Sequence, residues 1–243
     1  MNSSDSAERP GKARAGRLCP ALIVRVFVTF AGAAAAMFFC AGRLDWVMAW
    51  VYLGLLAAYT VTGMVNLVRV SPDLMDERRN AFKHKDVKWW DKLLLLAMAV
   101  GFPLGILVVA GLDERWAWSA TVPPAIRVAA LGLALAAILL MHWAMTTNRF
   151  FSAVIRIQTD RGHQVVDSGP YRYVRHPGYA GGILFYAATP LILGSLYALI
   201  GAFVLTCLVI LRAALEERIL KKELTGYEEY ARRVRWRLLP GIW

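Results

Sequence analysis

The sequence has few cysteines and is short of acidic residues. Its three cysteines, Cys19, Cys40 and Cys207, form no CxxC pair, which argues against a disulfide framework or a zinc site. The 17 acidic residues are outnumbered by 28 lysines and arginines, which gives a formal net charge of +11. Because the basic residues stand between apolar blocks, we expect them to contact anionic lipid headgroups at the membrane surface, and we expect no nucleic-acid partner.

The sequence also lacks the short motifs of soluble nucleotide-binding proteins and hydrolases. It has no GxGxxG, P-loop, HExxH or GxSxG motif. It has neither an internal repeat, which many transporters show, nor a polar stretch long enough for a separate soluble domain. These absences favour a single membrane domain, which we place at residues 21–243.

Hydrophobic residues make up 58% of the chain and gather in blocks of the length that a membrane-spanning helix needs. The blocks are Ala21–Ala41, Val47–Val68, Leu93–Leu112, Ala125–Met145 and Tyr179–Leu215. The last block is too long for one span and is interrupted at Gly194-Ser195, which predicts a helical hairpin. We therefore predict an all-α, multi-pass transmembrane helical bundle of about six spans.

Lysines and arginines alternate from one predicted loop to the next. Four of them precede residue 20, seven lie in 69–92, five in 149–175 and seven in 218–237, whereas the intervening loops hold only Arg43 or Arg115 or none. Cytoplasmic loops collect such residues. We therefore expect a protein of the cell membrane with both termini and its working site on the cytoplasmic side. Residues 1–20 are predicted to be a disordered basic arm.

Two of the predicted cytoplasmic segments, 147–179 and 212–217, are dense in polar and aromatic groups. In the second, Arg212 and Glu216 are four apart and share one face of a helix. Ionisable groups at this depth tend to line a cavity, which favours a functional role. Glu217 points about 100° away from Glu216, and we expect it to contact headgroups.

The histidines of this sequence do not predict a metal site. His163 and His176 have no third histidine or cysteine at a ligand spacing, so no metal is expected. For His142, in the middle of a span, we expect a hydrogen bond between helices. From the residues alone, an enzyme and a small transporter remain open alternatives.

A specific motif lies in the C-terminal part of the chain. It reads Gly169-Pro-Tyr-Arg-Tyr-Val-Arg-His-Pro-Gly-Tyr179, followed by Glu216-Glu217, Tyr230 and the segment Arg233–Pro240. In these residues the chain resembles the isoprenylcysteine carboxyl methyltransferase family and the related phospholipid methyltransferases. The resemblance covers residues 148–243, which it marks as the catalytic region.

The resemblance implies a membrane methyltransferase that uses S-adenosylmethionine at the cytoplasmic face without a Rossmann domain. It implies a catalytic set of Arg212, Glu216 and Arg175, with Arg212 facing the methyl acceptor. The residues implied to bind the cofactor are Gln158, His163, Gln164, Val165, Val166, Tyr171, His176, Tyr179 and Glu216.

The acceptor itself is not readable from the sequence. A lipophilic or small acceptor would reach the site from the bilayer, and its nucleophile is a carboxylate, an amine or a thiol. A carboxylate mainly needs alignment with the methyl group, whereas an amine also needs a base. Two other classes remain as alternatives, an NADPH-dependent steroid-type reductase and a non-catalytic membrane scaffold or transporter.

Overall fold

A computed structural model describes residues 20–70, 72–84 and 87–243. The predicted basic arm lies outside the described residues except for Pro20, which begins the first helix. The helices of the bundle are α1 (Pro20–Ala41), α2 (Val47–Val70), α4 (Trp89–Leu96), α5 (Phe102–Trp116), α6 (Pro124–Thr147), α7 (Pro177–Leu193) and α8 (Ala198–Glu223). The short helices are α3 (Pro72–Asn80), η1 (Ala81–Lys83), η3 (Thr159–Arg161), η4 (Gly169–Arg172) and α9 (Tyr227–Arg233), and η2 (Ala97–Gly101) is a π-helical turn.

The described residues form helices and loops, and the apolar helices match the predicted blocks. Four helices are long and apolar enough to cross a membrane, namely Val47–Arg69, Trp89–Trp116, Pro124–Thr147 and Ala198–Glu223. Two shorter apolar helices, Val26–Ala41 and Pro177–Leu193, complete the set in the described part of the chain. Gly194 ends α7 with a left-handed φ of +85°, as a glycine at this position favours. The predicted multi-pass helical bundle and its C-terminal hairpin are therefore confirmed.

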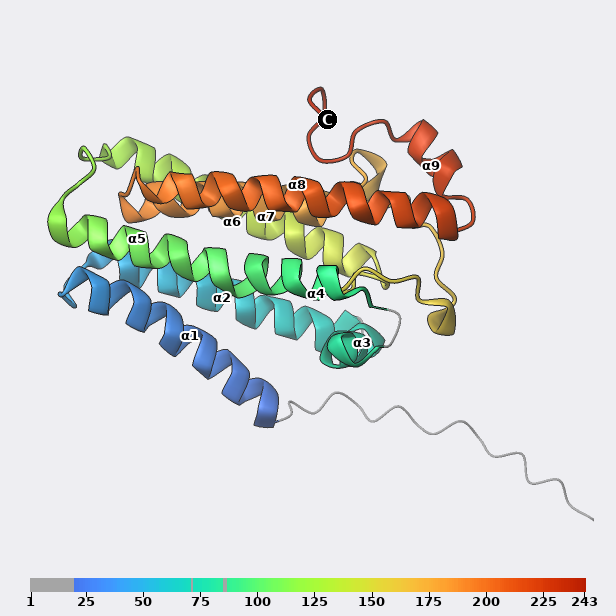
Figure 1. Ribbon diagram of the computed structural model, residues 1–243, viewed down its shortest axis with the longest axis horizontal. Helices are drawn as coiled ribbons and strands as arrows, with labels where there is room; N and C mark the ends of the chain where they lie inside the picture. Colours follow the sequence, from blue (N-terminus) through green and yellow to red (C-terminus); the bar gives the residue numbers. More distant parts are fainter. Residues whose placement is uncertain (1–19, 71, 85–86) are drawn as a thin grey trace, which may run out of the picture.

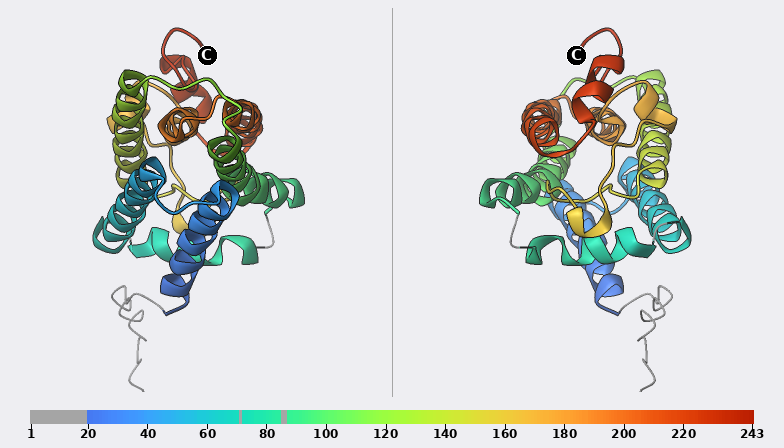
Figure 2. Two further views of the ribbon diagram at one scale, coloured as in Figure 1. Left: turned by 90° about the vertical axis from the view of Figure 1, so that its left-hand side faces the viewer. Right: turned by 90° about the vertical axis from the view of Figure 1, so that its right-hand side faces the viewer.

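The long helices form a closed ring of neighbours. Contacts join α6 to α7, α7 to α8, α8 to α5, α5 to α1, α1 to α2 and α2 back to α6, as the end-on views show (Figure 2). The α6–α7 pair packs most closely, because Gly181 of α7 faces the backbone of α6. A Cβ atom at Gly181 would lie 2.6 Å from Met141 Cγ and 3.0 Å from the carbonyl oxygen of Ala137. Small residues allow such close approach between membrane helices.

The span that begins at Trp89 is interrupted by the π-helical turn η2. Pro103 follows this turn, and a proline has no N–H to donate to the carbonyl four residues earlier. The helix locally widens instead, and the Phe102 N–H bonds the Ala97 carbonyl. Met98 and Ala99 of this turn line a cavity, so the π-helical turn forms part of the cavity wall.

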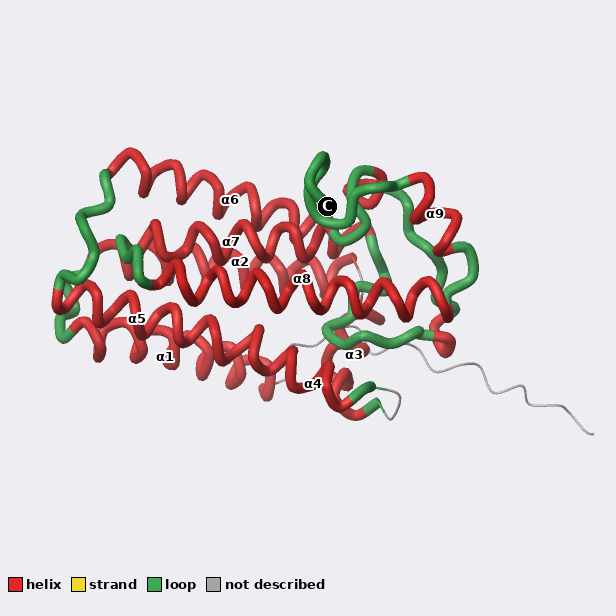
Figure 3. The backbone as a smooth tube through the Cα atoms, turned by 45° about the horizontal axis from the view of Figure 1, so that its top comes forward, coloured by secondary structure: helices red, strands yellow, loops and turns green. Residues whose placement is uncertain are grey.

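One end of the bundle gathers the segments that the charge pattern predicts to be cytoplasmic. Helix α3, the loop between α6 and α7, helix α9 and the C-terminus all lie toward this end (Figure 1). Short loops close the opposite end, where α5 meets α6 and α7 meets α8 (Figure 3). There the buried Asp113 accepts hydrogen bonds from the hydroxyls of Ser119 and Ser195, which fastens the two loops together. We call the end that holds α3, the loop between α6 and α7, and α9 the irregular end, and the candidate site lies there.

Candidate functional site

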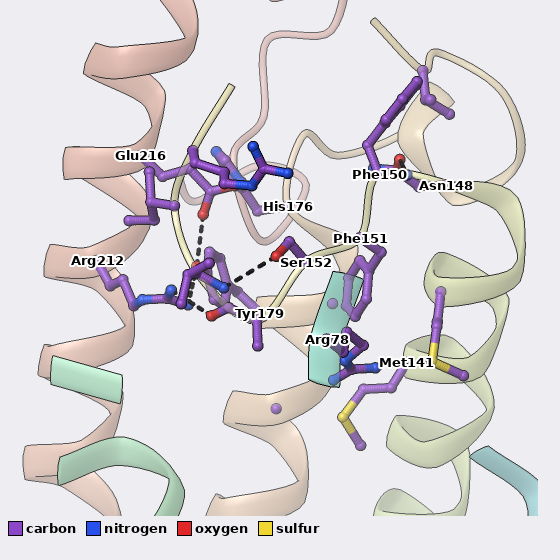
Figure 4. Close-up of a pocket in the computed structure, with 18 of the residues that line it drawn as sticks. Arg78, Met141, Asn148, Phe150, Phe151, Ser152, His176, Tyr179, Arg212 and Glu216 are labelled. Carbon is purple, nitrogen blue, oxygen red and sulfur yellow. Dashed lines mark hydrogen bonds between the residues drawn. The ribbon is translucent and has the colours of Figure 1, made fainter. Parts of the chain in front are cut away.

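A cavity of about 520 Å³ opens at the irregular end of the bundle (Figure 4). This volume is within the usual range for small-molecule and cofactor sites. Every site residue predicted from the sequence lines this cavity: Gln158, His163, Gln164, Val165, Val166, Tyr171, Arg175, His176, Tyr179, Arg212 and Glu216. The structure thus brings these residues together, while the roles assigned to them remain predictions.

Arg212 and Glu216 are connected through a third side chain. Tyr179, in the first turn of α7, donates its hydroxyl proton to Glu216 Oε2 at 2.6 Å and accepts a hydrogen bond from Arg212 Nη1 at 2.6 Å. Arg212 Nη2 also donates to the carbonyl oxygen of Ala153 at 2.8 Å. Figure 4 shows this chain of contacts along the wall formed by α7 and α8. The sequence correctly predicted one shared face, but not the tyrosine that bridges it.

Asp91 is a site residue that sequence reasoning missed. It lies in the first turn of α4 with 0% of its surface exposed, and its Oδ1 accepts a hydrogen bond from Arg212 Nε at 2.8 Å. Its Oδ2 accepts the backbone N–H of Ile155 at 2.7 Å. The available signal was a carboxylate two residues before a run of leucines, Leu93–Leu96. A buried carboxylate needs such partners, so Asp91 fixes both the guanidinium and the loop after α6.

Glu217 differs from its prediction. The expected headgroup contact is wrong, because Glu217 is 2% exposed and lies at the centre of an ion-pair cluster. Arg175 Nη2 donates to both of its oxygens at 3.0 and 3.1 Å, Arg237 Nε donates at 2.7 Å, and Lys221 Nζ lies at 2.8 Å. The helix geometry was read correctly, but the C-terminal tail folds back over the face that bears Glu217.

The C-terminal tail, residues 224–243, is held against the loop before α7 by backbone and side-chain contacts. The backbone N–H groups of Arg175 and His176 donate to the carbonyl oxygens of Trp236 and Arg237, each at 2.9 Å. Arg175 Nη1 donates to three further carbonyls of the tail, and Tyr230 donates its hydroxyl proton to the carbonyl of Tyr171 at 2.8 Å. Nη1 of Arg175 thus holds the tail, while its Nη2 is bound to Glu217 of α8.

The loop after α6 is organised around Gln158. The Gln158 side chain donates to the carbonyl of Phe150 at 2.8 Å and accepts a hydrogen bond from Arg161, while its backbone N–H donates to His163 Nδ1 at 3.3 Å. Burial of the imidazole is the main cause that lowers the pKa of His163 to about 4. His163 is therefore a neutral hydrogen-bonding group at neutral pH.

A second part of the cavity, which we call the apolar wing, extends between α2, η2 and α6. Tyr59, Met64, Met98 and Met141 line it, and methionine side chains adapt to varied apolar shapes. His142 lies on the same wall, and its Nε2 hydrogen-bonds Thr62 Oγ1 of α2 at 2.7 Å. The predicted bond between helices at His142 is therefore confirmed.

The polar part of the cavity retains groups that a ligand can bind. Among the described residues, the buried Tyr227 hydroxyl has no hydrogen-bond partner, and His176 Nε2 has none within hydrogen-bond distance but lies 3.8 Å from Glu217 Oε2; both residues line the cavity. Buried polar groups normally have partners, so these atoms are suited to a polar ligand. The described residues contain no group of three or more metal-binding side chains. The donor set and volume fit an organic cofactor with hydroxyl and amino groups.

Fold and site together define a multi-pass helical membrane protein with a cofactor-sized cavity at one end. Residues 130–222 match the model of the isoprenylcysteine carboxyl methyltransferase family, so this region of the chain is similar to that family.

Two curated relatives show the extent of the match. A probable protein-S-isoprenylcysteine O-methyltransferase of Oryza sativa subsp. japonica is 35% identical over 92 residues, which are 37% of this chain and 48% of the rice protein. Protein-S-isoprenylcysteine O-methyltransferase B of Arabidopsis thaliana is 33% identical over 92 residues, 37% of this chain and 47% of that protein. The match spans about half the length of these relatives.

Proposed function

We propose that the protein is a membrane methyltransferase that moves a methyl group from S-adenosylmethionine to the carboxylate of a lipophilic acceptor. One observation carries the proposal: the cavity joins a polar part, built largely from the family-matched segment, to an apolar wing between helices. A polar cofactor and a lipophilic acceptor can meet in such a cavity. The names of the plant relatives, which are O-methyltransferases of isoprenylcysteine, support a carboxylate as the acceptor.

The polar part offers complementary groups for the cofactor. S-adenosylmethionine, when bound, supplies an electrophilic methyl group on a positively charged sulfur. Glu216 accepts hydrogen bonds from hydroxyl or amino groups, and His176 Nε2 and the Tyr227 hydroxyl add polar contacts. The predicted cofactor-binding side chains Tyr171 and Tyr179 offer aromatic faces, which attract cations. The tail that covers this part of the cavity excludes water and retains the ligand.

The wall of Arg212, Tyr179 and Glu216 suits a carboxylate acceptor. Arg212 is fixed by Asp91 and by the carbonyl of Ala153, so its charge is held in one place. A fixed guanidinium aligns a carboxylate without removing a proton, which this acceptor does not require. Arg175 is bound to Glu217 and to the tail, and we propose that it positions the tail and does not contact the acceptor.

The orientation in the membrane belongs to the same proposal. Residues 69–92, the loop after α6 and residues 218–237 hold the largest groups of lysines and arginines. Positively charged loops stay on the cytoplasmic side. We therefore infer that the cavity opens toward the cytoplasm and the inner leaflet of a cell membrane.

A transfer assay on isolated membranes tests this function. Membranes that contain the protein are incubated with methyl-labelled S-adenosylmethionine and N-acetyl-S-farnesyl-L-cysteine, a simple isoprenylcysteine carboxylate. We expect a labelled product whose mass increases by one methyl group and whose label is released as methanol by base, as for an ester. His176→Ala and Glu216→Ala should lose most of this transfer. A base-stable product would contradict carboxylate methylation, and transfer unaffected by both variants would contradict the assigned site.

A further inference from the structure

His142 brings an unpaired ring nitrogen to the wall of the apolar wing. It lies near the end of α6 and follows Met141, which Figure 4 shows on the cavity wall. Among the described residues, the buried Nδ1 atom of His142 has no hydrogen-bond partner. Buried polar atoms normally have partners, so a nitrogen of this kind on a cavity wall is suited to a ligand group.

The hydrogen bond with Thr62 determines which nitrogen of His142 carries the proton. Thr62 Oγ1 donates its single proton to the carbonyl oxygen of Ala58 at 2.6 Å, and His142 Nε2 lies 2.7 Å from the same Oγ1. If Thr62 donated to Nε2 instead, two oxygens 2.6 Å apart would face each other without a proton between them. Nε2 is therefore the donor. A second proton on Nδ1 would add an unpaired charge in a mostly apolar setting, so we assign Nδ1 as an acceptor.

A glycine leaves the imidazole edge that bears Nδ1 uncovered. Gly63 of α2 lines the cavity, and a Cβ atom there would lie 3.3 Å from His142 Cε1 and 4.0 Å from Nδ1. Any larger residue at this position would crowd that edge. The absence of a side chain at Gly63 thus gives a ligand group room to approach Nδ1.

Two tyrosines add polar groups to the same wing. Tyr59 of α2 and Tyr186 of α7 line the cavity, and the ring centroid of Tyr59 lies 5.3 Å from that of His142. Neither tyrosine hydroxyl has a hydrogen bond to another described residue. A ligand hydroxyl can donate to Nδ1 and accept from a tyrosine, whereas a plain hydrocarbon chain can do neither. The wing therefore carries polar groups that a hydrocarbon would leave unpaired.

The helix packing places His142 deeper in the bundle than the proposed reaction centre. Gly181 of α7 packs against Met141, the residue before His142. Tyr179 lies two residues before Gly181, nearer the irregular end, and its hydroxyl accepts a hydrogen bond from Arg212. A ligand group at Nδ1 is therefore separate from a carboxylate at Arg212 and belongs to the chain that extends into the wing.

We propose that His142 Nδ1 accepts a hydrogen bond from a hydroxyl group on the lipophilic chain of the methyl acceptor. This inference rests on the proposed function and deepens it, because it names a neutral polar group that the chain carries. A site built to hydrogen-bond a hydroxyl rejects an analogue that lacks it, since the buried polar atom is then left unpaired. His142 thus determines specificity between a hydroxylated chain and a plain hydrocarbon, and it takes no part in the transfer of the methyl group.

Matched acceptor analogues test this assignment on the purified protein in lipid nanodiscs. The reference probe is N-acetyl-S-dodecyl-L-cysteine. Three analogues carry one hydroxyl group on the dodecyl chain, near the sulfur, in the middle or at the end. Affinities are measured for wild type, His142→Phe and Gly63→Ala. Gly54→Ala is the matched control, because it makes the same substitution in α2 where an added Cβ atom has nothing within 4 Å.

We expect wild type to bind one hydroxylated analogue about five- to tenfold more tightly than the plain chain, as one buried hydrogen bond provides. His142→Phe should reduce this preference to about twofold or less and leave affinity for the plain chain within about twofold of wild type. Gly63→Ala should reduce the preference in the same direction, and Gly54→Ala should keep it. Affinity for S-adenosylmethionine, measured on each variant, should not change.

Nitrogen NMR of protein labelled in its histidine side chains reads the tautomer directly, with His142→Phe to assign the signal. Nδ1 should be the unprotonated nitrogen, and its signal should shift on binding of the preferred analogue more than on binding of the plain chain. A proton on Nδ1 would overturn the inference. So would equal affinity for the plain chain and all three analogues, or a preference that survives both His142→Phe and Gly63→Ala. Failure of the proposed function looks different, because wild-type protein would then bind no S-adenosylmethionine.

Discussion

At the scale of single residues, the buried ion pair of Asp91 and Arg212 is the feature of the site that least tolerates the loss of a partner. Both side chains are almost completely buried, and Arg212 Nε donates a hydrogen bond to Asp91 Oδ1 at 2.8 Å. Removing one partner of such a pair leaves an uncompensated charge in a medium of low polarity. The geometry of Arg212 therefore depends on a residue from outside the family-matched segment.

Asp91→Asn is predicted to lower the free energy of unfolding by about 3 kcal/mol, since a buried charge loses its partner. It should also reduce methyl transfer more than it reduces affinity for S-adenosylmethionine. Denaturant titration of the protein in detergent measures the first effect, and single-turnover transfer measures the second. Asp45→Asn is the control, because the Asp45 side chain is 76% exposed and pairs with Arg43 at the opposite end. Equal effects of the two substitutions would contradict the role of Asp91.

His163 gives a prediction for pH dependence. Burial lowers the pKa of His163 from its usual value of 6.5 to about 4. Between these two values the unfolded chain binds a proton that the folded chain does not. The contribution of His163 to stability is therefore complete above about pH 6.5 and declines as the pH falls toward 4. NMR titration of imidazole-labelled protein, with His163→Gln to assign the signal among four histidines, should show a midpoint well below 6. A midpoint at or above 6.5 would rule out the buried neutral imidazole.

The sequence anticipated much of the site at this scale, and the omissions share one cause. Arg212 and Glu216 were paired by their spacing, and the motif from Gly169 to Tyr179 located the loop that faces them. Asp91 and Glu217 were missed or misread because most of their partners are distant in the chain, the exception being Lys221, four residues after Glu217. Asp91 meets Arg212 across 121 positions, and Glu217 is covered by a tail that returns from beyond α9. Helical periodicity carries no information about such contacts.

At the scale of elements, the proposed function gives the attachment of the tail the role of controlling access to the cavity. Tyr230 is 2% exposed and donates its hydroxyl proton to the carbonyl of Tyr171. Tyr230→Phe is predicted to speed dissociation of S-adenosylmethionine about five- to tenfold, since one anchoring hydrogen bond is lost. It should also accelerate amide exchange in residues 224–243. Tyr173→Phe is the matched control, because Tyr173 is 62% exposed. Unchanged dissociation in Tyr230→Phe would show that the tail does not retain the cofactor.

The α6–α7 contact gives a prediction that needs no ligand. Gly181→Ala would place a Cβ atom 2.6 Å from Met141 Cγ and 3.0 Å from a backbone oxygen, so we expect unfolding to become easier by about 1 to 3 kcal/mol. Gly182→Ala has nothing within 4 Å of the added atom, and it should be neutral or slightly stabilising. Thermal unfolding in one detergent compares the two. Similar losses for both variants would contradict the close packing at Gly181.

The helices themselves were predictable from the sequence, because apolar block length and glycine breaks determine them. The predicted and observed spans agree closely, including the break at Gly194. The π-helical turn η2 was not predicted, since it depends on how Pro103 is accommodated within one span. The closing of the helices into a ring also depends on contacts between distant segments, which hydropathy does not encode.

At the scale of the whole molecule, the arrangement predicts which side of the membrane each loop faces. In a variant with Cys19, Cys40 and Cys207 replaced by serine, Arg232→Cys and Thr121→Cys place single thiols at exposed positions at opposite ends. A membrane-impermeant thiol reagent should label the first only from the cytoplasmic side and the second only from the outer side. Labelling of both from one side would contradict the topology.

The central claim is that the polar cavity binds S-adenosylmethionine, and equilibrium binding of the labelled cofactor to purified protein tests it most directly. The account predicts one saturable site per chain, weakened at least about tenfold in His176→Ala and Glu216→Ala. Binding should be retained in Gly54→Ala and should not be displaced by NADPH. Absence of saturable binding, binding that ignores both cavity substitutions, or displacement by NADPH would contradict the account.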